Sequence, residues 1–107
     1  MIVAFSVAPT VVDNTSADMA AAVSAAVRVV RESGLPNETN AMFTLIEGQW
    51  DEVMAVIKQA TDAVLAVSPR ASLVIKADIR PGHSNQIKTK VDSVERHLAQ
   101  AENEGEK

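Results

Sequence analysis

The sequence predicts one α+β domain whose strands and helices follow in the order β-α-β-β-α-β-α. Two patterns predict these elements: short β-branched runs that end at proline or glycine, and longer stretches with an aliphatic residue every three or four positions. The length of 107 residues suits a single core. The chain contains no cysteine, so it has neither a disulfide framework nor a thiolate for metal binding or catalysis.

The first two elements are a strand over residues 2–8, which ends at Pro9, and a helix that begins at Thr15 or Ser16. Alternate strand residues share a face, so one side of the strand carries Val3, Phe5 and Val7. The helix has an apolar stripe at helical spacing, and Gly34 is expected to terminate it.

Two short strands, residues 37–40 and 43–47, are expected to form a hairpin that turns near residues 40–42. Gly48 then leads into a second helix over about residues 50–67, which Ser68 and Pro69 end. The predicted buried stripe of this helix consists of Val53, Ile57, Ala60, Val64 and Val67.

The last strand is predicted over residues 72–80, with Leu73, Ile75, Ala77 and Ile79 on one face. A third helix follows over about residues 85–101. We expect the domain to span residues 1–102 and the Glu-rich residues 103–107 to form a frayed acidic tail.

The first six elements match the split βαβ of the ferredoxin-like fold, a four-stranded antiparallel sheet with two helices on one face. The other face is expected to be uncovered and to carry Ile2, Ala4, Ile46 and Val74 beside Ser6, Thr44 and Lys76. Such a face indicates a subunit interface or a ligand wall, with a solvated sheet as the alternative. The third helix adds an aliphatic stripe that also needs a partner, made of Ile87, Val91, Val94 and Leu98.

Composition argues against several classes of function. The net charge is −4 and the basic residues are scattered, which argues against nucleic-acid binding. The apolar runs are too short to span a bilayer, so we expect a cytoplasmic protein without membrane contact. His83 and His97 lack partners at metal-ligand spacing, and no nucleophile–base pair stands out. The sequence therefore predicts no metal, no cofactor and no catalytic residue.

Glu47 is the most informative polar residue, because it lies where a β-branched strand meets a glycine turn and a helix start. It is either a ligand-binding group or an exposed helix-start carboxylate that contributes a few tenths of a kcal/mol to stability.

Four segments together resemble the small thiamine-binding proteins of ferredoxin-like fold. These are residues 2–9, the Glu-Ser-Gly-Leu of residues 32–35, residues 44–53 and the Lys/Asp/Arg strand before the last helix. The resemblance covers nearly the whole chain, from Ile2 to about Glu95. It implies a homo-oligomer, a dimer or tetramer, that binds thiamine or its hydroxymethylpyrimidine half without turning it over.

Carried over residue by residue, the resemblance implies ligand contacts from Glu47, Asn40, Thr44 and Ser16. A carboxylate can accept from the amine of an aminopyrimidine, and amide or hydroxyl groups match the ring nitrogens. The chain departs from the family at Phe43, where relatives commonly have glycine. The Phe43 ring either stacks on the pyrimidine or fills the pocket.

Two other functions remain open from the residues alone. One is a small ferredoxin-like enzyme of the monooxygenase or isomerase type, in which Trp50 and His83 would be the residues to suspect. The other is a regulatory or scaffold module without a small ligand.

Overall fold

The computed structural model describes residues 1–10 and 16–105, and for residues 16–18 it describes the backbone alone. Strand and helix bounds follow in chain order: β1 (Ile2–Pro9), α1 (Ser16–Glu32), β2 (Asn37–Thr39), β3 (Thr44–Glu47), α2 (Trp50–Leu65), β4 (Ala71–Asp78) and α3 (Gln86–Gly105). This is the order predicted from the sequence.

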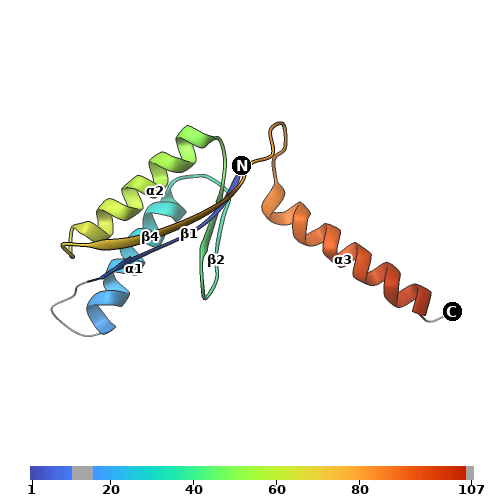
Figure 1. Cartoon of the computed structure of the whole chain (residues 1–107), viewed down its shortest axis with the longest axis horizontal. Coiled ribbons are helices and arrows are strands. Elements are labelled where there is room, and N and C mark those ends of the chain that lie inside the picture. The colour runs from blue at the N-terminus through green and yellow to red at the C-terminus, as the bar shows by residue number, and fades with distance from the viewer. Residues whose placement is uncertain (11–15, 106–107) are drawn as a thin grey trace.

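The four strands form one sheet in the order β2-β3-β1-β4, and every neighbouring pair is antiparallel. Helices α1 and α2 cover one face, while α3 extends away from the sheet (Figure 1). The strand order and the two covering helices are those of the ferredoxin-like split βαβ. The predicted fold class, including the extra C-terminal helix, is confirmed.

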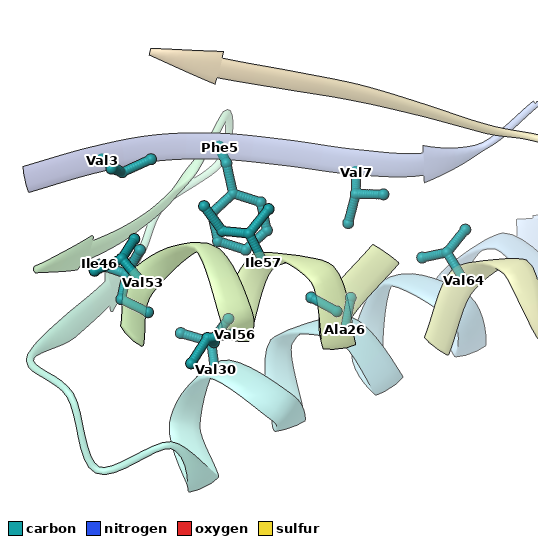
Figure 2. Close-up of a cluster of buried hydrophobic side chains, with 11 residues drawn as sticks. Val3, Phe5, Val7, Ala26, Val30, Ile46, Val53, Val56, Ile57 and Val64 are labelled. Atoms are coloured by element: carbon teal, nitrogen blue, oxygen red, sulfur yellow. The ribbon is translucent and has the colours of Figure 1, made fainter. Parts of the chain in front are cut away.

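The core lies between the sheet and α1 and α2 (Figure 2). Val3, Phe5 and Val7 point from β1 toward these helices, as the alternation predicted. Ala22 and Ala26 of α1 are also buried, and their small side chains let α1 lie close to α2. Aliphatic residues of α2 complete the layer. The edge strand β4 is less well covered, since Leu73 and Ile75, which pair with Val7 and Phe5, remain 40 and 38 % exposed.

The phase of β3 is opposite to the prediction. Val3 pairs with Ile46 and Phe5 pairs with Thr44, so both β3 residues share the helix-covered face with β1's core residues. Ile46 is fully buried and Thr44 is buried. The prediction was wrong because β3 is four residues long and has adjacent apolar residues, so either phase buries one of them. Leu45 takes the place expected of Ile46 on the outer face.

Three element ends also differ from the prediction. Helix α2 ends at Leu65, so Val67 lies beyond it and is exposed rather than buried. Strand β4 ends at Asp78, which leaves Ile79 and Arg80 in the following turn. Helix α3 continues to Gly105, so residues 103–105 are helical. Positive φ at Gly34 (81°) agrees with its predicted role after α1.

Candidate functional site

A hollow opens beside β1 because β1 is longer than its neighbour β3. Strand β3 pairs with Ile2–Phe5 alone, so Ser6 and Ala8 have β4 on one side and no strand on the other. The hollow has a volume of about 200 Å³. Its walls come from the end of β1, the β2–β3 turn and one side of α1, and include Ser6, Val23, Val27, Asn40, Phe43 and Thr44.

The hairpin turn is held by the side chain of Asn40. Its Oδ1 accepts hydrogen bonds from the backbone N–H of Met42 at 2.8 Å and of Phe43 at 2.9 Å. The backbone N–H of Asn40 donates to the Phe43 carbonyl at 3.0 Å. This local bonding is the usual reason for asparagine in a turn. Within the described part of the chain, the Asn40 NH₂ group makes no hydrogen bond, so it remains available as a donor beside the hollow.

One hydroxyl group and one aromatic ring complete the polar and apolar lining, because the side chain of Ser6 alternates with Phe5 and Val7 and so faces the outer side of the sheet. The Thr44 hydroxyl forms no hydrogen bond with any residue that the structure describes. Phe43 is half-buried against the same space. Sequence reasoning missed Ser6 as a lining residue. The available signal was the difference in length between an eight-residue first strand and a four-residue partner.

Glu47 lies elsewhere, on the outer face of the sheet, where it pairs with Ile2. Its carboxylate accepts from the backbone N–H of Gln86 at 2.8 Å and of Ile87 at 3.2 Å. Only 4 % of Glu47 is exposed, so of its two interpretations the exposed carboxylate at a helix start is wrong. Glu47 binds the N-terminus of α3 instead, where free N–H groups and the helix dipole favour a negative charge.

At Gly48, next to Glu47, the chain passes close to the first turn of α2. A Cβ at this position would lie 2.6 Å from Oε1 of Glu52. That same oxygen accepts from the backbone N–H of Gln49 at 2.8 Å, which caps the start of α2. The absence of a side chain at Gly48 therefore leaves room for the Glu52 carboxylate that caps α2.

The structure thus separates the predicted site residues. Asn40, Phe43 and Thr44 line one hollow. Glu47 contacts the first residues of α3 and does not line that hollow. The side chain of Ser16 falls outside the described residues.

Trp50 and His83, suspected for an enzyme, line a second hollow of about 170 Å³ together with Met1 and Arg80. Trp50 comes from the first turn of α2, and His83 from the turn after β4. No carboxylate, serine or threonine lines this hollow among the described residues. The imidazole therefore has no nucleophile or orienting acid beside it there.

The described residues contain no group of three histidine, aspartate or glutamate side chains that could hold a metal ion. In the same part of the chain, no helix combines the length and the apolar character needed to cross a membrane.

Fold and hollow define a small ferredoxin-like domain with a semi-enclosed pocket at its hairpin. The family model for thiamine-binding proteins matches residues 3–95. The chain belongs to this thiamine-binding protein family, which confirms the resemblance drawn from the sequence.

A relative from Mycobacterium bovis is similar to this chain over nearly the whole length of both, and two solved structures share its fold. UPF0045 protein Mb1933 of Mycobacterium bovis is 52% identical over 95% of this chain and 98% of its own length. The crystal structure of MJ1052 from Methanocaldococcus jannaschii superposes with a TM-score of 0.73 at 30% identity, over 87% of this chain and 93% of that one. A Thermotoga maritima protein, described as a proposed thiamine biosynthesis/salvage protein, shares the fold with a TM-score of 0.69 at 21% identity, over 83% and 94% of the two chains.

Proposed function

We propose that this chain binds the hydroxymethylpyrimidine half of thiamine, or thiamine itself, without converting it, as a cytoplasmic homo-oligomer. One observation carries the proposal: a member of the thiamine-binding family has a hollow whose wall includes Asn40 and Thr44, two positions to which the family resemblance gives ligand contacts, together with Phe43. The thiamine connection of the Thermotoga maritima protein is consistent with it.

The size and chemistry of the hollow suit a substituted pyrimidine. A volume of about 200 Å³ lies below the roughly 300–1,000 Å³ of most ligand pockets, which favours the pyrimidine half over a larger ligand. The free Asn40 NH₂ group can donate to a ring nitrogen, while the Thr44 hydroxyl can accept from an exocyclic amine. Val23 and Val27 provide an apolar wall for the ring.

Glu47 is the second candidate for ligand contact. A carboxylate has about four lone-pair positions, and the two N–H groups of α3 use two of them. The remaining positions could accept from an aminopyrimidine amine beside the first turn of α3. If the ligand binds at Glu47, Glu47→Gln should weaken binding and Asn40→Ser should not. If it binds at the hairpin, the two substitutions should have the opposite effects.

Calorimetric titration of hydroxymethylpyrimidine into the parent, Asn40→Ser and Glu47→Gln chains separates these positions. Serine can still accept from the turn amides but lacks the NH₂ donor. A lost hydrogen bond of about 0.5–1.5 kcal/mol weakens binding by roughly twofold to tenfold. We expect this loss for Asn40→Ser and parent affinity for Glu47→Gln. The reverse result would move the site to Glu47, and an absence of binding in all three chains would contradict the proposed function.

Phe43→Gly tests whether the ring stacks on the ligand or fills the space. If Phe43 stacks on the pyrimidine, the substitution weakens binding. If Phe43 fills the pocket, the parent binds poorly and Phe43→Gly gains affinity. Circular dichroism of both chains serves as the control, because the turn hydrogen bonds of Asn40 use backbone atoms at position 43 and survive the substitution.

Two further experiments test which class of ligand binds and whether the ligand is converted. Among the described residues, no lysine or arginine lines the hollow, so phosphorylation of the ligand should not improve binding. Proton NMR of thiamine and hydroxymethylpyrimidine incubated with the parent should show unchanged ligand after hours. New ligand signals that disappear in His83→Ala would favour the enzyme alternative.

A further inference from the structure

Helix α3 is a long arm that stands off the rest of the chain. It runs from Gln86 to Gly105 over 20 residues, or about 30 Å at the rise of an α-helix. The Cα radius of gyration is 17.1 Å, whereas a compact domain of this length is expected at about 13 Å. Figure 1 shows the cause, because α3 points away from the sheet and from α1 and α2.

The arm carries an apolar stripe that the described part of the chain leaves largely exposed. Val91, Val94 and Leu98 are exposed by 58, 58 and 54 %. Their spacing, together with half-buried Ile87, places them along one side of α3. An isolated helix of this length is only marginally stable in water, and most helices are stabilised by packing their apolar side. The exposed side chains of the stripe therefore need a surface to pack against.

Contacts of its first two turns hold α3 in the direction in which it leaves the sheet. Glu47 accepts from the N–H groups of Gln86 and Ile87, and Lys90 forms an ion pair with Asp78 at 2.6 Å. Glu47 and Asp78 both pair with Ile2, so both contacts lie at one end of the outer sheet face. Folding α3 back over its own sheet would require these contacts to rearrange.

That outer sheet face is the second uncovered surface of the chain. Its residues alternate with the core residues of β1 and its neighbours, and include Ile2, Ala4, Leu45, Val74 and Lys76. Val74 is 53 % exposed in the middle of β4. Helices α1 and α2 both lie on the opposite side, as Figure 1 shows. The face thus combines aliphatic side chains with polar ones such as Ser6, Lys76 and Asp78, and the two covering helices leave it open.

We propose that the α3 stripe of one copy packs across the outer sheet face of a second copy, and that the exchange is reciprocal. Both complementary surfaces are present on every chain, so a twofold axis satisfies all four at once. Charge also fits: in the described part of the chain Lys76 has no ion-pair partner, and neither do Glu95 and Glu102, which flank one side of the stripe. The inference rests on the self-association in the proposed function and does not depend on the ligand.

Cross-linking tests this pairing directly, because the chain has no native cysteine. A size-tagged Val74→Cys chain is mixed and refolded in turn with Val91→Cys, Val94→Cys and Leu98→Cys chains and treated with a short bis-maleimide. We expect a covalent heterodimer in at least one mixture. Gln100→Cys, two residues past Leu98 and so about 200° around α3 from it, serves as the matched control and should give none. Products formed only within single-variant samples, β4 to β4 or α3 to α3, would overturn the arrangement.

Light scattering gives the second test. Leu98→Asp should raise the dimer dissociation constant at least tenfold, whereas Gln100→Asp, on the far side of α3, should leave the parent mass unchanged. Lys76→Glu should weaken the dimer, and Lys76→Glu combined with Glu95→Lys and Glu102→Lys should restore it. Far-UV circular dichroism confirms that each variant is folded. A monomeric parent, or a Leu98→Asp chain as dimeric as the parent, would overturn the proposal.

Discussion

The two halves of this chain use the same kind of aliphatic side chain in opposite ways. In the body, formed by the sheet with α1 and α2, residues such as Val3, Ile46 and Val64 are fully buried. In the arm α3, no described residue is buried, although its stripe has the same helical spacing. The comparison teaches that spacing identifies an apolar side of a helix and does not tell whether its partner lies in the same chain.

The largest expected effect is the difference in free energy of unfolding between a substitution in the body and one in the arm. Ile46→Ala should lower the free energy of unfolding by about 2–5 kcal/mol, because it leaves a cavity in the core. The loss should be the same at every protein concentration. Leu98→Ala should change unfolding of the separated monomer by about 0.5 kcal/mol or less, as at other exposed positions. Its effect should appear as the protein concentration rises and dimers form.

Urea unfolding of both variants at 1 µM and 100 µM checks this contrast. Parent and Ile46→Ala curves should shift together with concentration, while the Leu98→Ala curve should shift less than the parent's. A concentration-independent loss of 2 kcal/mol or more in Leu98→Ala would break the comparison, since it would place Leu98 in a core of its own chain.

The next effect concerns the junction between the two regions. Glu47→Ala removes the acceptor for Gln86 and Ile87, and a hydrogen bond to a charged group contributes about 1.5–3 kcal/mol. We expect the first turn of α3 to open more often while the body stays folded. Hydrogen exchange should then become at least tenfold faster at the amides of residues 86 and 87. Glu95→Ala, which removes an exposed carboxylate from the same helix, should leave these rates unchanged.

The smallest effect is the pH dependence of the Asp78–Lys90 pair. The hydrogen bond and charge of Lys90 lower the pKa of Asp78 below its ordinary value, with a smaller contribution from Arg80. A carboxyl group whose pKa is lower in the folded chain stabilises it above the unfolded pKa, about 3.9, and loses this effect as the pH falls through the folded pKa. Acidification through this range should loosen the arm more in the parent than in Asp78→Asn, as measured by exchange at residues 88–90.

The fold could be predicted from the sequence because each element of the body has a clear pattern. Strand β1 alternates over eight residues, and α1 and α2 carry long apolar stripes that proline, glycine or Ser68 ends. The phase of β3 could not be predicted, because four residues with Leu45 beside Ile46 fit either face. The turn at Asn40 was predicted correctly, since its side chain bonds locally.

The site was predictable only where local structure determines it. Asn40, Phe43 and Thr44 belong to one hairpin and so lie together. Glu47 contacts Gln86 and Ile87, which lie 39 and 40 positions later in the chain. No pattern near Glu47 in the sequence predicts this contact. Ser6 was missed for the same reason, because its exposure to the hollow depends on where β3 stops.

Amide chemical shifts offer the most direct test of the central claim, that the body alone holds a pyrimidine site at its hairpin. Hydroxymethylpyrimidine is titrated into ¹⁵N-labelled protein, and the shifts of all assigned amides are followed. We expect saturable changes at residues 5–8 and 39–44, with the amide shifts of residues 86 and 87 in the arm unchanged. Changes confined to Glu47 and the start of α3, or no change at millimolar ligand, would contradict it.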